Sequence, residues 1–397
     1  MESDPSSETE ENYNNLIESD FSYVNIDKLN SSKNSRENVT ISLGTPTVNN
    51  GSLRNFVTYP ISGSDSTGNI QTSRRYKDFK ALRDILSRQW PGCYMPQIPP
   101  KQMTGNLGKD FIDKRKVLLE AFLMKIAKIP YIYHSEIVQQ FVRGPQEFHK
   151  CVGHYGRLPF QKLAPLYKEV FSEFTSFVSN SESHKEMEDA QKHFSGCLAQ
   201  LQVFEGWCKY TTDYFEYYQK EVQNLFIDLK SVNQVYAEEK NINLETRNLT
   251  TNPYSVLLGW VRTEILDLEG LNEAIQGRFM LEAIKLKIAD RIDEERENLI
   301  KIQSGKKNFV QILLQKNKEQ YIEKTSREIT NLEEELKCVE KIVNIVTGTL
   351  LNGVIPKFKE GKQHMYEIVL KTFTSSSIKE LEFLIAQNKQ IERDILN

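Results

Sequence analysis

The sequence predicts an α+β domain with a three-stranded antiparallel sheet, followed by an elongated all-α region of three long helices that form a coiled coil. Apolar and polar residues alternate in short runs after residue 38, which is typical of strands. Apolar residues then recur every three or four positions from residue 183 onward, in stretches of about fifty residues. Polar segments divide this second part of the chain into three helices.

Composition fits a chain of this kind. The chain has 397 residues, which suffices for two or three domains. Hydrophobic residues make up 39% and charged residues 26%, so part of the chain should be elongated and helical. No uncharged apolar run reaches eighteen residues, so we expect no membrane-spanning helix. The amino terminus has no apolar segment of the secretory kind, and five scattered cysteines are expected to be reduced thiols.

Charge is distributed unevenly along the chain. Residues 1–37 carry nine acids and three bases, a net charge of −6, whereas residues 38–143 carry fifteen bases and seven acids, a net charge of +8. A domain this basic within an acidic chain indicates an anionic partner, for which nucleic acid and acidic lipid are both candidates. Residues 1–37 are rich in Ser, Asn and Glu, and we expect them to be a disordered acidic tail.

Three short alternating segments predict the sheet. Val39–Leu43 and Asn55–Tyr59 are the first two, with Asn50-Gly51 as a tight-turn signal between them, and Asn69–Ser73 is the third. Helical spacing follows in segments that begin after Tyr76 and Phe111, and in a short last one at 137–142.

A separate amphipathic segment spans residues 159–178. Its apolar stripe is wide, and its polar face mixes lysines with glutamates. An interfacial helix on a membrane and an ordinary core helix are both consistent with this pattern.

The long helices begin near residue 183 and should need one another to cover their apolar stripes. Polar breaks at Asn241–Pro253 and Ser304-Gly305 separate them. The third carries a seven-residue repeat from Ile322 to Leu350, which we expect to drive dimerisation. Gly353 and Pro356 should bend its last part.

The basic domain contains residue types suited to holding a phosphorylated ring. Arg75 offers a planar, bidentate donor for a phosphate, and the ring of Tyr76 offers a packing surface. Lys101 follows two prolines and offers a point charge, while Arg115 lies one predicted helix later and can donate to ring hydroxyls. No nucleophile or metal-ligand spacing accompanies them, so we expect neither an enzyme nor a cofactor nor a metal site.

The run Arg74-Arg75-Tyr76-Lys77-Asp78-Phe79 resembles the signature of PX (phox-homology) domains. Pro99-Pro100-Lys101 and Phe111-Ile112-Asp113-Lys114-Arg115 resemble that family's proline-rich loop and its second-helix motif. Followed by long amphipathic helices, the chain is similar to sorting nexins of the PX-BAR type. The resemblance implies a PX domain at 38–143, an amphipathic linker helix at 159–178 and a BAR-type helical dimerisation domain at 183–397.

The resemblance also implies a role for each basic-domain residue. Arg75 would contact the 3-phosphate, Tyr76 would pack on the inositol ring, Lys101 would contact the 1-phosphate, and Arg115 would contact the 4- and 5-hydroxyls. In that family this set favours phosphatidylinositol 3-phosphate, a lipid of early endosomes. The implied location is therefore the cytosolic face of endosomal membranes.

Other contacts with the membrane are expected at two places. The loop in the basic domain carries apolar residues that can either insert into the bilayer or pack beneath the loop, namely Met95, Ile98, Met103 and Leu107. A basic patch lies near the turn between the second and third long helices and would be the tip of a BAR domain: Lys301, Lys306, Lys307, Lys316 and Lys318.

These expectations favour a membrane-binding protein with no nucleic-acid partner, because no groove-reading helix or stacking platform is evident. Phosphoinositide membranes and a second BAR-type chain, the same or different, are the expected partners. The expected process is endosomal sorting and recycling, with autophagy-related traffic as an extension. The alternative is a phosphoinositide-anchored scaffold or tether that recruits partners without bending membrane.

Overall fold

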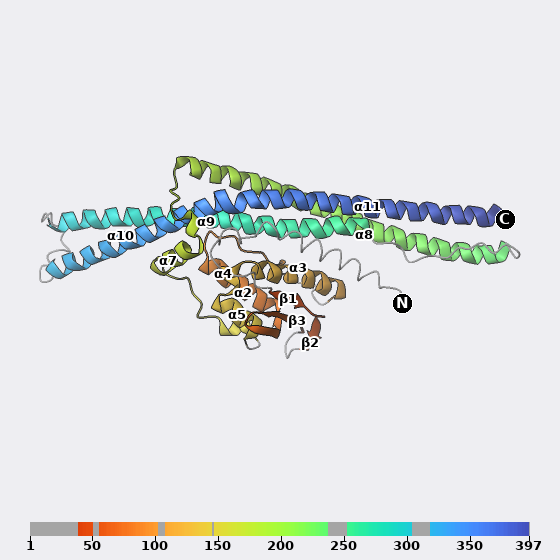
Figure 1. Cartoon of the computed structure of the whole chain (residues 1–397), viewed down its shortest axis with the longest axis horizontal. Coiled ribbons are helices and arrows are strands. Elements are labelled where there is room, and N and C mark those ends of the chain that lie inside the picture. Colours follow the sequence, from red (N-terminus) through yellow and green to blue (C-terminus); the bar gives the residue numbers. More distant parts are fainter. Residues whose placement is uncertain are drawn as a thin grey trace. The chain divides into compact units, whose positions relative to one another are not determined.

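The computed structural model describes residues 39–50, 55–101, 108–144, 147–236, 252–303 and 318–396. The predicted acidic tail and Gly51 of the predicted turn lie outside these residues. The chain divides into two compact units, whose helices and strands are labelled in Figure 1. Unit 1 comprises the described parts of Ser195–Leu268 and Phe358–Asn397, and unit 2 comprises those of Val24–Phe194 and Glu269–Lys357.

The sheet in unit 2 is antiparallel, as predicted. Strand β3 (Phe56–Asp65) is central and pairs along its length with β4 (Gly68–Arg75). Its other edge pairs with β1 (Thr40–Leu43) and β2 (Thr47–Asn49) in succession. The first predicted strand forms β1. Strand β2 was not predicted and makes the sheet four-stranded instead of three-stranded; it is separated from β1 by Pro46, which has no backbone N–H to donate to a ladder.

Five helices accompany the sheet and form its core. They are α2 (Tyr76–Gln89), α3 (Lys109–Ala127), α4 (Pro130–Tyr133), α5 (Glu136–Arg143) and α6 (Phe148–Cys151). The ring of Phe79 on α2 is fully buried and meets Tyr59, Phe122 and Phe141 edge-on, with centroids 5.0–6.4 Å apart. The predicted helical segments are confirmed, and they place the start of α2 directly after β4.

Arg74 is part of this core, because its side chain is fully buried. Its guanidinium donates to the carbonyls of Phe141 at 2.7 Å, Gly144 at 2.9 Å and Gln140 at 3.2 Å. These carbonyls lie at the carboxyl end of α5, where a helix leaves its last acceptors without internal partners. Arg74 therefore stabilises the fold and is not accessible to a ligand.

The amphipathic segment forms α7 (Phe160–Val170) and the short η3 (Ser172–Phe174), and both pack against α10 (Lys318–Thr349) of unit 2. Leu163 and Tyr167 are fully buried, and the Tyr167 hydroxyl donates to the Pro91 carbonyl at 2.7 Å. Of the two interpretations left open by the sequence, the core helix is correct. The apolar face of α7 is covered by protein, so it is not free to insert into a bilayer.

The long helices are α8 (Ser181–Tyr236), α9 (Pro253–Gln303) and α10 (Lys318–Thr349), which continues through the π-helical turn η6 (Leu350–Val354) into α11 (Ile355–Leu396). The predicted three helices are confirmed. The π turn lies where Gly353 and Pro356 predict a local irregularity, and π turns are a recognised cause of helix distortion.

The seven-residue repeat of α10 is buried within the single chain. Val339 and Val343 are fully buried, and Val346 and Leu350 are 2% and 1% exposed. The prediction that this repeat drives dimerisation is therefore wrong, because its apolar side chains already pack inside unit 2. An 18-residue window within Gln320–Asp394 is apolar enough to cross a membrane, but 61% of it is buried, as in a core helix.

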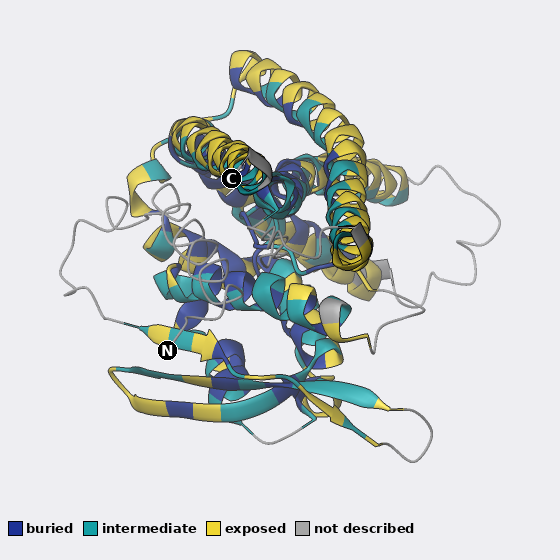
Figure 2. Ribbon diagram, turned by 90° about the vertical axis from the view of Figure 1, so that its right-hand side faces the viewer, coloured by how far each residue is buried: buried dark blue, intermediate teal, exposed yellow. Residues whose placement is uncertain are grey.

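Unit 1 has a small core and a long exposed apolar face. Its core includes Cys208 on α8 and Val261 on α9, and Lys362 of α11 lies 2.8 and 2.7 Å from Glu264 and Asp267. On the exposed side of α8, four large rings follow a seven-residue repeat. We call them the aromatic stripe: Trp207, Tyr210, Tyr214 and Tyr217, which are 59–64% exposed. Figure 2 shows many exposed residues on the long helices.

Candidate functional site

Arg75 ends β4 and is the residue immediately before α2. Its backbone N–H donates to the buried carboxylate of Asp78 at 2.8 Å, which fixes the start of the helix. Its guanidinium stacks over the ring of Phe56, 3.6 Å from the centroid, and lies 3.4 Å from the Glu147 carboxylate. With 31% of the side chain exposed, Arg75 is held in place but accessible.

Tyr76 and Arg115 form the centre of the site. The guanidinium of Arg115 lies 4.3 Å from the centroid of the Tyr76 ring and 4.2 Å from that of Phe111. Such cation–π contacts hold the side chain between two rings. The Tyr76 hydroxyl donates to the Pro99 carbonyl at 2.7 Å, and Arg115 donates to that of Pro100 at 3.3 Å.

Burial alters the proton affinities of this pair. It lowers the pKa of Arg115, although the nearby hydroxyls of Tyr59 and Tyr76 oppose the shift, and it raises the pKa of Tyr76 against the charge of Arg115. Arg115 is only 7% exposed, and its Nε has no hydrogen-bond partner among the described residues. A buried guanidinium with an unused donor favours a ligand that brings acceptor oxygens.

Lys101 directly follows the Pro99-Pro100 turn and is exposed. The structure therefore brings Tyr76, Arg115 and the turn that carries Lys101 together, while the Arg75 side chain contacts Phe56 and Glu147. Together they present two guanidiniums, an ammonium and a tyrosine ring from β4, α2, α3 and one loop. This set of donors suits an anion that also carries hydroxyl groups.

The prediction that Met95 inserts into the bilayer is wrong. Met95 is only 2% exposed, because its segment packs against α9. The approach is close: a Cβ added to Gly270 of α9 would lie 2.7 Å from the Met95 carbonyl oxygen. Ile98 is half-buried. Met103 and Leu107 lie outside the described residues, so their role stays a prediction.

The predicted basic patch is described only in part. Lys301 is exposed and pairs with Glu297 one turn earlier on α9 at 3.2 Å. Lys318 begins α10, and Lys306, Lys307 and Lys316 lie outside the described residues.

Sequence reasoning missed three residues of the site. Phe111 could have been predicted from the sequence, since it precedes Arg115 by four positions on one helix and such residues share a face. Phe56 and Glu147 come from distant parts of the chain and gave no such signal. Glu147 is the one non-glycine with positive φ (60°) among the described residues, which cannot be seen in the sequence.

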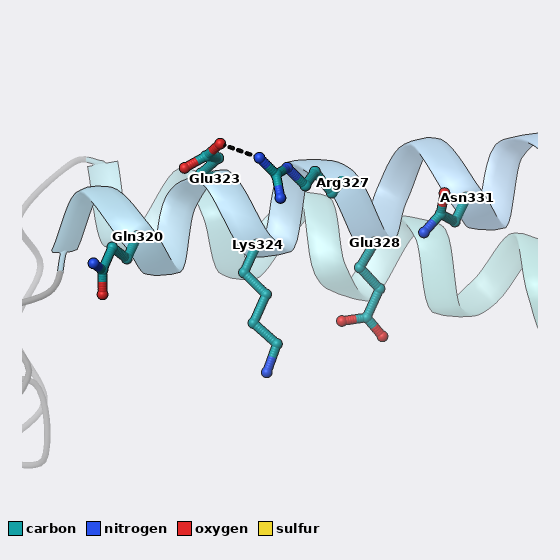
Figure 3. A pocket seen from close by; sticks show the side chains of 6 residues that line it. All are labelled: Gln320, Glu323, Lys324, Arg327, Glu328 and Asn331. Carbon is teal, nitrogen blue, oxygen red and sulfur yellow. Dashed lines mark hydrogen bonds and ion pairs between the residues drawn. The ribbon is translucent and has the colours of Figure 1, made fainter.

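A shallow hollow lies beside α10, lined by one face of that helix (Figure 3). Its side chains mix charges, and Glu323 pairs with Arg327 at 2.5 Å. Within the described ranges no group of three His, Cys, Asp or Glu could hold a metal ion. The donors around Arg115 are therefore the stronger candidate site.

Comparison with known proteins agrees with this geometry. Residues 63–144 match the family model of the PX domain. Over 358 residues the chain is 23% identical to Sorting nexin-4 of Candida glabrata, an alignment that covers 82% of each chain. Residues 63–144 are therefore a PX domain, and most of the chain is similar to a sorting nexin.

Other similarities are more local. Vacuolar protein sorting-associated protein vps5 of Schizosaccharomyces pombe is 32% identical over 125 residues, which cover 30% of this chain and 22% of that protein. The chain thus spans about a fifth of the length of that relative. The solved SNX-BAR Mvp1 tetramer aligns over 88% of this chain and 99% of that chain at 15% identity. Its TM-score of 0.45 adds no support.

Proposed function

We propose that the chain is a non-enzymatic peripheral membrane protein that binds phosphatidylinositol 3-phosphate through its PX domain. The observation that carries the proposal is the placement of Arg115, whose buried guanidinium is held between two rings with its Nε unused. Phosphate and ring hydroxyls of an inositide supply the acceptors that this site lacks.

Each residue has a proposed role that follows the family resemblance. Arg75 holds the 3-phosphate, Tyr76 packs on the inositol ring, Lys101 contacts the 1-phosphate and Arg115 contacts the 4- and 5-hydroxyls. Arg75 must leave Glu147 to do so. An exposed pair at 3.4 Å is weak, whereas a guanidinium binds a phosphate through two charge-assisted bonds, so the phosphate should displace the carboxylate.

A flotation assay tests the site. Vesicles of phosphatidylcholine with phosphatidylinositol 3-phosphate should carry the wild-type chain, whereas Arg75→Ala should stay unbound. Arg88→Ala removes an exposed arginine from the other end of α2 and should bind as wild type does. If Arg75→Ala floats as well as wild type, the assignment of the phosphate site is wrong.

We further propose that the helical region pairs with a second BAR-type chain, either another copy or a different sorting nexin. The aromatic stripe supports this, since Trp and Tyr are the residues most often found at the centre of protein interfaces. Two headgroup sites per dimer would strengthen membrane binding through linkage. The proposed setting is endosomal sorting and recycling, with autophagy-related traffic as an extension.

The domain boundaries remain part of the proposal. They are an acidic tail at 1–37, the PX domain at 38–143, the linker helix at 159–178 and the helical dimerisation domain at 183–397. The burial of α7 removes one means of wedging a bilayer, so bending would have to come from the paired helices. Tubulation of vesicles distinguishes this from an anchored scaffold, which would bind without forming tubules.

A further inference from the structure

Glu273 of α9 connects the two elements of unit 2 that carry the proposed headgroup site. Its carboxylate accepts a hydrogen bond from the Gln97 side chain at 2.6 Å and forms an ion pair with Arg83 of α2. Arg83 lies two turns along the helix that begins with Tyr76, and Gln97 lies in the proline-rich segment that ends at Lys101. One carboxylate of the helical region therefore holds both elements.

The proline-rich segment lies directly on α9. A Cβ on Gly270 would lie 2.7 Å from the Met95 carbonyl, and a Cβ on Gly277 would lie 2.7 Å from the backbone nitrogen of Gly92. Gly270, Glu273 and Gly277 are three and four residues apart, so they share one face of α9. On this face, the two glycines lie where the backbone of the proline-rich segment comes closest to α9. The Glu273 carboxylate lies opposite the side-chain amide of Gln97, which donates to it.

The position of Gln97 determines the position of the nearby residues that contact the binding site. Pro96, Pro99 and Pro100 restrict the backbone on both sides of Gln97 and leave it few alternative conformations. Pro99 then accepts the Tyr76 hydroxyl, and Pro100 accepts Arg115. The segment thus joins α9 to three of the four proposed headgroup ligands within five residues.

We infer that Glu273 is a positioning residue for the headgroup site, acting through Gln97 on the turn that carries Lys101. The inference rests on the proposed function. Its consequence is that the helical region sets the affinity of the PX domain for its headgroup, in addition to any role of its own at the membrane. Arg83 is 13% exposed and Glu273 42%, so this link lies partly in solvent and can be altered without opening the core.

The test measures binding of soluble inositol 1,3-bisphosphate to the full chain by calorimetry, which removes membrane avidity. Glu273→Leu and Gln97→Leu should each weaken binding by about threefold to tenfold, the range for residues coupled to a distant site. The double variant should bind no more weakly than Glu273→Leu alone, because both changes break one connection. An effect on stability alone would lower the melting temperature and leave headgroup affinity unchanged.

Glu333→Leu is the matched control. It removes a glutamate of α10 that pairs with Arg296 of α9 at 2.6 Å, so it breaks a similar link between helices away from the proline-rich segment. It should bind the headgroup as wild type does. If Arg75→Ala abolishes binding while Glu273→Leu and Gln97→Leu bind as wild type does, the inference is wrong and the proposed function stands. If Arg75→Ala binds normally, both are wrong.

Discussion

The two compact units differ in how completely they cover their apolar side chains. Of the large apolar residues that are exposed in the described parts of the chain, seventeen lie in unit 1 and seven in the larger unit 2. Unit 2 buries its repeat along α10, its linker helix α7 and the core of the PX domain. Unit 1 leaves the aromatic stripe of α8 open. The difference indicates that unit 2 folds as a self-contained body, whereas unit 1 presents a surface for a second chain.

The largest effect should follow from breaking a buried contact in unit 2. Arg74→Met removes the guanidinium donor from the Phe141 and Gly144 carbonyls at the end of α5, and we expect a loss of about 3–5 kcal/mol in the free energy of unfolding. Urea denaturation followed by circular dichroism measures it. Arg88→Met, on the exposed surface of α2, should change stability by less than about 0.5 kcal/mol. Equal effects would mean that the buried arginine does not hold the domain together.

The aromatic stripe should affect association instead of folding. The double change Trp207→Ser and Tyr214→Ser should weaken dimerisation by about a thousandfold, since central aromatic residues of an interface contribute about 2 kcal/mol each. Sedimentation velocity over a range of concentrations measures it. Leu286→Ser, an equally exposed apolar site on α9 in unit 2, is the control and should leave the dimer intact. If the wild-type chain is a monomer at micromolar concentration, the aromatic stripe is not a dimer interface and the contrast between the two units is wrong.

Glycines sharpen the contrast between the units. Gly277→Ala in unit 2 would place a Cβ 2.7 Å from the backbone of Gly92, and we expect a cost of about 1–3 kcal/mol in unfolding free energy. Gly196→Ala in unit 1 meets nothing within 4 Å and should be neutral or stabilising by up to about 1 kcal/mol. Thermal melting of the two variants gives the comparison directly. Destabilisation of the same size in both would contradict the close packing at Gly92.

The smallest effect concerns pH. Burial raises the pKa of Glu269, the nearby Glu273 raises it further, and Arg83 opposes the shift. A carboxyl group whose pKa is raised by folding stabilises the protein below its unfolded pKa, and this contribution is lost as the pH rises through the folded value. Glu269→Gln should therefore raise the melting temperature at pH 7 by about one or two degrees and have no such benefit at pH 4. An equal shift at both values would exclude titration as the cause.

Much of the fold could be predicted from local pattern. Strand alternation, helix spacing and the polar breaks depend on residues near one another, and they placed β3, β4, α2 and the long helices correctly. What covers an apolar face depends on distant residues, so the sequence could not show that Tyr167 of α7 packs in the protein or that Val343 of α10 is buried inside one chain. The dimer face was therefore predicted on α10, whereas the exposed rings lie on α8.

The site divides in the same way. Arg75, Tyr76, Lys101 and Arg115 were chosen from a motif, and the structure brings Tyr76 and Arg115 into contact. The residues that hold these side chains in place come from other elements and could not be predicted. The clearest case is Glu273, which contacts Gln97 although the two lie 176 residues apart. The spacing of Gly270 and Gly277, seven residues apart on a helix, was the one available signal that another backbone approaches α9 closely.

Binding of the full chain to vesicles tests the central claim most directly. Phosphatidylcholine vesicles with and without phosphatidylinositol 3-phosphate, prepared at several diameters, are mixed with the purified protein and sedimented. The account predicts that the protein sediments only with vesicles that contain the 3-phosphate lipid, and most strongly with the narrowest. Equal sedimentation with both compositions, or none at any diameter, would contradict it.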